Sequence, residues 1–141
     1  MSDILTLNNI TKQFGDVVAN RDISLSIAHG EIHALLGENG AGKSTLMNIL
    51  SGIYQADSGS IMINDQPVII RNPKDAQTAG IGMIHQHFKL VDQLSGLDNL
   101  LLGQVEGLWI KRKQALQRYQ QLISEYQLHI DLTKKASEMS M

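Results

Sequence analysis

The sequence predicts an α/β protein whose first part is built mainly from strands and whose last part is helical. Short apolar runs separated by turn residues dominate before residue 90. An apolar stripe of helical period runs through residues 110–126. A glycine-rich segment, residues 37–42, lies between a predicted strand and a predicted helix. With 141 residues, 43% of them apolar, the chain has enough hydrophobic side chains for a core.

The composition excludes several classes of protein. Lys and Arg total 12, Asp and Glu total 14, and the net charge of -2 argues against a nucleic-acid binder that acts through bulk positive charge. The absence of Cys rules out disulfide frameworks and thiolate metal sites, and it suits a reducing compartment. No apolar run approaches the roughly 18 residues of a membrane span, and the first residues do not begin a secretory signal.

The first 36 residues are predicted to contain three strands. Apolar residues in 4–11 indicate the first strand, and residues 23–27 alternate apolar side chains with Ser, which is typical of a half-buried strand. Gly15-Asp16 is a hairpin-type turn between them. The apolar run 32–36 ends at Gly37, as a buried parallel strand does.

The period then changes to that of a helix. Apolar residues at i, i+3, i+4 and i+7 predict an amphipathic helix over 43–50, and Gly52 occupies the place of a C-terminal cap. Residues 61–63 are expected to form a strand, residues 64–67 a turn, and residues 68–70 a strand that pairs back.

The remaining elements are predicted mainly as helices. Asn72-Pro73, an N-cap followed by Pro at the first helical position, opens a short helix that runs to about residue 79. Residues 81–84 form an apolar strand, residues 97–102 a short helix and residues 110–126 a longer one.

Residues 37–45, Gly-Glu-Asn-Gly-Ala-Gly-Lys-Ser-Thr, match the pattern of a phosphate-binding loop, G-x-x-x-x-G-K-[ST]. A chance match is expected about 0.006 times in a chain of this length and composition, and the flanking strand and helix are the context that the pattern requires. The glycines let successive backbone N–H groups approach an anion, and the helix N-terminus adds about half a positive charge. The alternative is a glycine-rich turn without a ligand.

Each residue of this motif has an expected part in binding ATP with Mg²⁺. Lys43 would reach the β and γ phosphates, the Ser44 hydroxyl would be a Mg²⁺ ligand, and Thr45 would donate to the α phosphate. The backbone of the preceding residues, called the phosphate loop below, would form the cradle: Gly37, Glu38, Asn39, Gly40, Ala41 and Gly42.

The residues around this motif resemble a known family. Residues 36–47, Leu-Gly-Glu-Asn-Gly-Ala-Gly-Lys-Ser-Thr-Leu-Met, look like the Walker A segment of an ABC-transporter ATPase. Residues 53–61 are similar to the stretch that follows it there, and residues 81–88, Ile-Gly-Met-Ile-His-Gln-His-Phe, resemble the Q-loop region. The resemblance extends from about Leu5 to the last residue. Residues 85–88, together with Asn-Pro-Lys-Asp-Ala before them, look most like importers for nucleosides or simple sugars, which often carry two ATPase halves on one chain.

The resemblance implies the fold and its division. We expect the N-terminal portion of an α/β P-loop NTPase of the ABC ATPase type, with an antiparallel β subdomain and the start of an α-helical subdomain. Residues 1–95 would form the nucleotide-binding core with the antiparallel β subdomain, the P-loop and the Q-loop. Residues 96–141 would form the beginning of the α-helical subdomain.

The resemblance also implies further site residues. Phe14 lies where the family places its adenine-stacking aromatic, and the alternative is a core or turn-packing Phe. Gln86 would contact Mg²⁺ and the attacking water, so that Lys43 and Gln86 would be catalytic and Ser44 and Gln86 would serve the metal. Gln86 could otherwise be a solvated loop residue. Trp109 is expected to be a packing anchor between helices, with contact to a membrane subunit as the alternative.

Hydrolysis in this family needs groups that we expect beyond residue 141: a carboxylate for Mg²⁺, an adjacent Glu and a downstream His. Met62–Asp65 is an apolar run followed by Asp, but it is predicted to be an antiparallel hairpin turn. Residues 136–141 resemble the approach to the family's L-S-G-G-Q motif, with Met139-Ser140 aligned to its Leu-Ser. We therefore expect a truncated chain with absent or very weak catalysis.

The expected function of the parent protein is to energise solute import, of a nucleoside or a simple sugar. Its partners would be ATP, transmembrane permease subunits and a second ATPase domain in a homodimer or tandem dimer, with no nucleic acid. It would lie peripherally at the cytoplasmic face of the cell membrane. For this chain alone we favour the alternative, a nucleotide-binding module without turnover. A small P-loop kinase or GTPase is a remote alternative, because it would require Asp65 as the metal carboxylate and the chain has no N-K-x-D motif.

Overall fold

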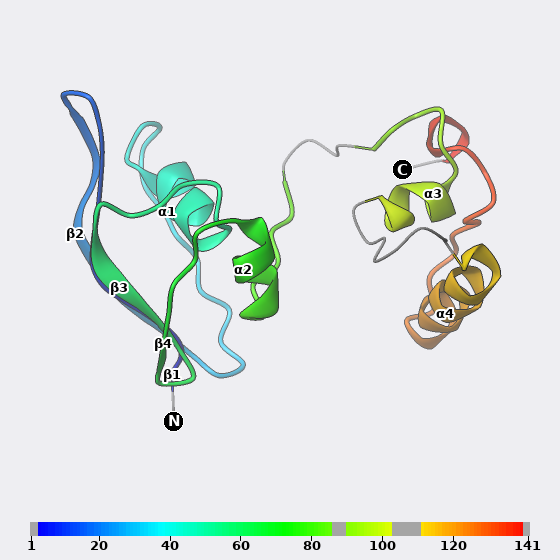
Figure 1. Cartoon of the computed structure of the whole chain (residues 1–141), viewed down its shortest axis with the longest axis horizontal. Coiled ribbons are helices and arrows are strands. Elements are labelled where there is room, and N and C mark those ends of the chain that lie inside the picture. The colour runs from blue at the N-terminus through cyan, green and yellow to red at the C-terminus, as the bar shows by residue number, and fades with distance from the viewer. Residues whose placement is uncertain (1–2, 86–89, 103–110, 140–141) are drawn as a thin grey trace. The chain divides into compact units, whose positions relative to one another are not determined.

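A computed structural model describes residues 3–85, 90–102 and 111–139 of the chain (Figure 1). The chain divides into two compact units, Met1–Ile84 and His85–Met141, which we call the N-terminal and C-terminal units. Each unit is described by itself. Within the described residues, no helix is both long enough and apolar enough to cross a membrane.

The N-terminal unit is built on a four-stranded antiparallel sheet with the order β2-β1-β3-β4. Its strands are β1 (Asp3–Phe14), β2 (Val17–Ala28), β3 (Ser58–Ile63) and β4 (Gln66–Val68). Leu7 of β1 lies opposite Leu25 of β2 on one side and Ile61 of β3 on the other, so that β1 is a central strand. The predicted hairpin turn Gly15-Asp16 is confirmed, because it joins β1 to β2.

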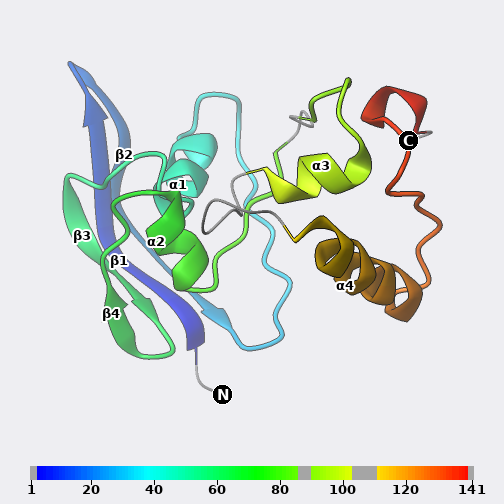
Figure 2. The same cartoon turned by 45° about the vertical axis from the view of Figure 1, so that its right-hand side comes forward.

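Two helices cover one face of this sheet. Helix α1 (Lys43–Leu50) and helix α2 (Pro73–Thr78) lie on the same side of the sheet in both Figure 1 and Figure 2. The core between the sheet and the helices consists of Leu7, Ile10, Leu46, Ile49, Leu50, Ile61, Ile70 and Ala76. Burying a Leu or Ile side chain contributes about 1.5–3 kcal/mol, so this one-sided core holds α1 on the sheet.

The predicted helix ends of this unit are confirmed. Gly52 follows the C-cap of α1 with a φ of 75°, and a Cβ atom there would lie 2.3 Å from the Asn72 carbonyl oxygen. Asn72 is the N-cap of α2, and its side-chain oxygen accepts a hydrogen bond of 3.0 Å from the Asp75 N–H. The two caps therefore meet, and they bring the end of α1 against the start of α2.

Two predicted strands are wrong. Residues 32–36 and 81–84 belong to no strand, and they are largely exposed: Ile32 is 98% exposed, Leu36 89% and Ile84 92%. A parallel strand needs neighbouring strands to pair with its backbone and to cover both faces. Among the described residues, the sheet consists of β1 to β4 alone, and none of these strands pairs with either segment.

The second hairpin of the sheet is tighter than predicted. The turn consists of Asn64 and Asp65, with φ of 49° and 61°, and β4 already begins at Gln66 and ends at Val68. A two-residue turn with both residues at positive φ matches the twist of the flanking strands, so no four-residue loop is needed. The interpretation of Met62–Asp65 as an antiparallel hairpin is confirmed, since β3 and β4 pair across this turn.

The C-terminal unit contains helices α3 (Gly96–Leu101) and α4 (Arg112–Glu125) and the 3-10 helix η1 (Ala136–Glu138). Both α helices agree with the predicted ones to within a few residues at each end. Ser95 is the N-cap of α3, and Leu97 and Leu132 are buried. Arg112 Nη1 lies 2.6 Å from Asp98 Oδ1, which ties α4 to α3.

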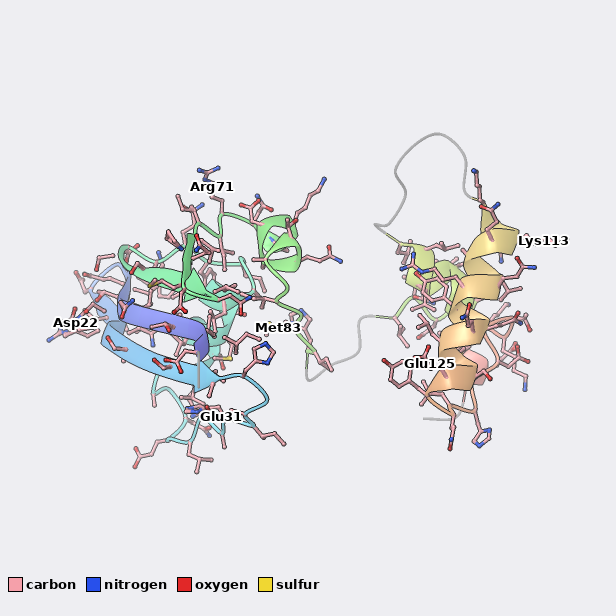
Figure 3. All side chains as sticks on the ribbon, turned by 90° about the horizontal axis from the view of Figure 1, so that it is seen from below. Asp22, Glu31, Arg71, Met83, Lys113 and Glu125 are labelled. Carbon is pink, nitrogen blue, oxygen red and sulfur yellow. The ribbon has the colours of Figure 1, made fainter. Side chains whose placement is uncertain are left out.

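Helix α4 is otherwise a solvated element. None of its residues is buried, and the basic residues at its start are exposed. Lys113 and Glu125, labelled in Figure 3, lie near its two ends. Of the residues with expected roles, Gln86, Trp109 and Ser140 lie outside the described residues.

Candidate nucleotide-binding site

The phosphate loop, residues 37–42, leads directly into α1 and forms a compact turn. The Ala41 N–H donates a hydrogen bond of 3.2 Å to the Glu38 carbonyl oxygen. Gly40 and Gly42 both have a φ of 86°, a backbone conformation that residues with a Cβ atom rarely adopt. The glycines at these positions therefore allow the path of the loop.

Gly42 is also packed against β2. A Cβ atom at Gly42 would lie 2.1 Å from the Ala19 carbonyl oxygen, so no side chain fits there. Asn20 Nδ2 donates a hydrogen bond of 3.2 Å to the Gly42 carbonyl oxygen, and Asn20 is only 5% exposed. The end of the phosphate loop is thus attached to β2, an edge strand of the sheet.

The ammonium group of Lys43 folds back over the phosphate loop. Its Nζ donates hydrogen bonds of 2.6 Å to the Gly37 carbonyl oxygen and 2.7 Å to the Glu38 carbonyl oxygen. Both acceptors are neutral. An anionic oxygen would be a stronger partner for the ammonium, because charge-assisted hydrogen bonds are roughly twice as strong as neutral ones.

The first turn of α1 offers polar groups around this ammonium. Gly42 is the N-cap, and no side chain caps the first turn. The N–H groups at a helix N-terminus together with the helix dipole favour an anion. Ser44 is exposed and Thr45 is half-buried, so two hydroxyl groups accompany Lys43 at the helix start.

The Ser44 hydroxyl suits Mg²⁺ only as one ligand among several. Mg²⁺ prefers oxygen ligands in octahedral geometry, and it usually keeps water molecules and takes further ligands from substrate phosphates. No group of three or more His, Cys, Asp or Glu residues that could hold a metal ion occurs in the part of the chain that the structure describes. The Ser44 hydroxyl is an oxygen donor of the kind that such an ion takes.

Phe14 ends β1 at the hairpin that joins β1 to β2. In Figures 1 and 2 this hairpin and the phosphate loop lie at the same end of the N-terminal unit. Phe14 is 41% exposed, so it is not a core residue. Its ring packs edge-on against Tyr54, with 5.1 Å between the ring centroids and 70° between the planes.

A charged pair adjoins this aromatic pair. Lys12 Nζ lies 5.4 Å from the centroid of the Phe14 ring and 2.7 Å from Asp57 Oδ1. Asp57 Oδ2 accepts a hydrogen bond of 2.7 Å from the Gln13 N–H. The hydrogen bond from Lys12 and, secondly, the one from the Gln13 N–H hold the pKa of Asp57 below its ordinary value.

Sequence reasoning missed Tyr54 and Asp57. Both belong to the turn segment that follows α1, and the sequence signal for them was limited to turn residues after a helix. Their contacts with β1 depend on how far the chain returns after α1, which spacing in the sequence does not reveal.

A family model described as ABC transporter matches residues 20–141. The chain belongs to the ABC transporter family. This confirms the resemblance noted in residues 36–47, and it agrees with the loop geometry described above.

Curated ABC relatives share much of this sequence. The guanosine import ATP-binding protein NupO of Bacillus subtilis (strain 168) is 46% identical over 143 aligned residues, which cover 100% of this chain and 28% of NupO. The ribose import ATP-binding protein RbsA 1 of Burkholderia thailandensis is 56% identical over 103 residues, which cover 73% of this chain and 20% of that protein. The chain thus spans about a quarter of the length of these relatives.

Solved structures confirm the expected fold class, the N-terminal portion of an ABC ATPase. The ATP-binding cassette MJ1267 of an ABC transporter superposes with a TM-score of 0.83 at 26% identity, covering 99% of this chain and 60% of that chain. The ADP conformation of the same cassette matches with a TM-score of 0.82 at 25% identity, over 99% of this chain and 60% of that chain.

The ABC site in this chain is described only in part. Gln86, which the resemblance assigns to metal binding and catalysis, lies outside the described residues together with His87 and Phe88. Its neighbour His85 is exposed. The structure describes Lys43, Ser44 and Thr45 at the start of α1, directly after the phosphate loop, and Phe14 at the hairpin between β1 and β2.

Proposed function

We propose that this chain is the ATP-binding part of an ATPase subunit that energises import of a nucleoside or a simple sugar across a membrane. The observation that carries the proposal is the phosphate loop, which opens α1 and has the Lys43 ammonium over its carbonyl oxygens. The names of the relatives, a guanosine importer and a ribose importer, support both solute classes.

Lys43 would bind the nucleotide by exchanging its hydrogen-bond acceptors. The Lys43 ammonium would leave the Gly37 and Glu38 carbonyl oxygens for the β and γ phosphates, which carry more negative charge. Thr45 would donate to the α phosphate, and Ser44 would supply one oxygen to Mg²⁺. When bound, that ion neutralises charge on the phosphates. Phe14 would stack on the adenine ring.

The parent protein would need partners to couple ATP to transport. We propose a second ATPase domain and transmembrane permease subunits, with the ATPase subunit peripheral at the cytoplasmic face of the membrane. Gln86, just after the exposed His85, would sense the bound Mg²⁺ and water and pass closure of the site to the permease.

A second candidate function, nucleotide binding without turnover, applies to this chain alone. Asp65 follows the apolar residues of β3, but it lies in the hairpin turn to β4 with a φ of 61°. An acidic residue that serves Mg²⁺ in a P-loop site belongs beside the loop, after a strand of the central sheet. The position of Asp65 therefore also argues against the kinase and GTPase alternatives.

Calorimetric titration of Mg·ATP tests the proposed binding. We expect the wild-type chain to bind, and Lys43→Ala to bind about tenfold more weakly or worse, since hydrogen bonds to charged groups contribute about 1.5–3 kcal/mol. Lys113→Ala, an exposed lysine on α4, is the matched control and should bind like the wild type. Equal affinities of the wild type and Lys43→Ala would refute the proposal.

Steady-state phosphate release separates the two candidate functions. For this chain alone we expect release no faster than that of Lys43→Ala, because binding without water activation gives no turnover. Release that depends on Lys43 would show that the 141-residue chain hydrolyses ATP by itself, and the second candidate would then be wrong.

A further inference from the structure

Tyr54 is an aromatic residue with a direct contact to the proposed site but no part in the function described so far. Its ring centroid lies 5.1 Å from that of Phe14, and the two planes are inclined by 70°. Tyr54 is 37% exposed, so the contact leaves both rings accessible in part. An edge-to-face pair of this geometry is the arrangement that aromatic quadrupoles favour.

The backbone of Tyr54 is fixed to α1. The Tyr54 N–H donates a hydrogen bond of 3.1 Å to the Asn48 carbonyl oxygen, and the Ile53 N–H donates one of 2.9 Å to the same oxygen. Helix α1 begins at Lys43 and is held on the sheet by its buried apolar residues. One rigid element therefore carries the phosphate-loop lysine at its start and Tyr54 just beyond its end.

The segment after Tyr54 is fixed to β1 as well. The Asp57 N–H donates a hydrogen bond of 2.9 Å to the Thr11 carbonyl oxygen, and the Asp57 carboxylate binds both the Lys12 ammonium and the Gln13 N–H. Lys12 Nζ in turn lies 5.4 Å from the Phe14 ring centroid. Tyr54 and Lys12 thus both contact the Phe14 ring, while 41% of Phe14 remains exposed.

A restricted ring binds a base better than a free one. An exposed Phe beside a two-residue turn would otherwise sample several rotamers, and ordering it would oppose binding. We propose that Tyr54 is a positioning residue that holds the Phe14 ring in the orientation that stacks on the nucleobase. The inference rests on the proposed ATP-binding function. It adds a residue that affects binding of the base, through the Phe14 ring, and not binding of the phosphates.

Paired titrations with Mg·ATP and Mg·tripolyphosphate test this inference, because tripolyphosphate has no base. We expect Tyr54→Leu to weaken ATP binding about fivefold. A fivefold loss of affinity corresponds to about 1 kcal/mol, the low end of the range that stacking of one base on one aromatic ring contributes. Its affinity for tripolyphosphate should equal that of the wild type. Tyr54→Phe keeps the aromatic contact and should bind both ligands like the wild type.

Tyr126→Leu is the matched control, because it is the same substitution at a tyrosine that is 69% exposed at the end of α4. It should bind both ligands like the wild type. Equal losses of ATP and tripolyphosphate affinity in Tyr54→Leu would reveal a general structural role and overturn the inference. Unchanged ATP affinity in Tyr54→Leu, or a loss in Tyr54→Phe as large as in Tyr54→Leu, would overturn it too. A wild-type chain that binds neither ligand would refute the proposed function itself.

Discussion

At the scale of single residues, Gly42 is the position where the phosphate loop tolerates the least change. The main chain has a φ of 86° there, and a Cβ atom would collide with the Ala19 carbonyl oxygen at 2.1 Å. Gly40 has the same φ, but nothing lies within 4 Å of its would-be Cβ atom. Replacing Gly40 therefore introduces backbone strain alone, whereas replacing Gly42 introduces backbone strain and a steric overlap with β2.

Replacing each of these glycines by alanine gives a matched pair of variants. Gly40→Ala should lower the free energy of unfolding by about 1–2 kcal/mol, the cost of left-handed backbone for a residue with a Cβ atom. Gly42→Ala should cost more than Gly40→Ala, because β2 or α1 must also shift. Urea denaturation followed by circular dichroism measures both values. Equal losses would show that Gly42 is not packed against β2 as described.

Asn20 is the second residue on which the loop depends. Its Nδ2 donates to the Gly42 carbonyl oxygen, whereas its buried Oδ1 has no hydrogen-bond partner among the described residues. An unsatisfied buried oxygen costs free energy, so the hydrogen bond to Gly42 comes together with an unfavourable contribution from Oδ1.

Substitutions of Asn20 should differ in their effect. Asn20→Leu loses one hydrogen bond but also removes the unsatisfied oxygen, and we expect a change in unfolding free energy of about 1 kcal/mol or less. Asn20→Asp places a buried carboxylate beside the Gly42 carbonyl oxygen, and we expect a loss of about 2 kcal/mol or more. Thermal unfolding compares them, and an Asp variant as stable as the Leu variant would contradict this account.

At the scale of elements, helices were easier to predict than strands. The turn chemistry of Asn72-Pro73 and the apolar spacing of residues 46–53 are local signals, and both helices appear where these signals place them. The apolar runs 32–36 and 81–84 do not by themselves determine a strand, because a strand must pair with segments elsewhere in the chain. Tyr54 and Asp57 were missed for the same reason, since their contacts with β1 are long-range.

The contact between α3 and α4 should depend on pH. The Ser95 hydroxyl and, to a smaller extent, Arg112 hold the pKa of Asp98 below its ordinary value of 3.8. A carboxyl with a lowered pKa in the folded state contributes stability above its ordinary value, and this contribution is lost as the pH falls from 3.8 through the lowered pKa.

Circular dichroism at decreasing pH measures this dependence in the C-terminal unit. We expect Asp98→Asn to be less stable than the wild type at neutral pH and to lose less helix on acidification below the ordinary pKa. Asp92→Asn, at an exposed aspartate of the same unit, should follow the wild-type curve. An Asp98→Asn curve that parallels the wild type would show that the Asp98 interactions do not stabilise this unit.

At the scale of the whole molecule, the exposed apolar segments have a further consequence. Ile32, Leu36 and Ile84 are each about nine-tenths exposed or more, because the two segments that carry them are unpaired among the described residues. Exposed apolar side chains of this size favour association between molecules. We expect the chain to self-associate with rising concentration, and Leu36→Asp with Ile84→Asp to reduce that association in sedimentation velocity. A wild type that stays monomeric at all concentrations would contradict this prediction.

The family could be read from the sequence more completely than the fold could. Residues 36–47 carry it in one continuous stretch, and such a stretch needs no tertiary contact to be recognised. The sequence also placed Lys43 at the start of a helix, but not the hydrogen bonds of its ammonium to the carbonyl oxygens of the loop. Those bonds depend on the curvature of the loop, which the left-handed glycines Gly40 and Gly42 and the packing of Gly42 on β2 determine.

The central claim is that residues 37–45 bind the phosphates of ATP. Two-dimensional proton–nitrogen NMR of the wild-type chain during addition of Mg·ATP tests it most directly, because every backbone amide reports separately. We predict the largest shifts at the amides of Gly40, Gly42, Lys43 and Ser44, with smaller shifts at Phe14 and Tyr54 and little change in α4. Shifts that gather in α4, or an unchanged phosphate loop at saturating nucleotide, would contradict the claim.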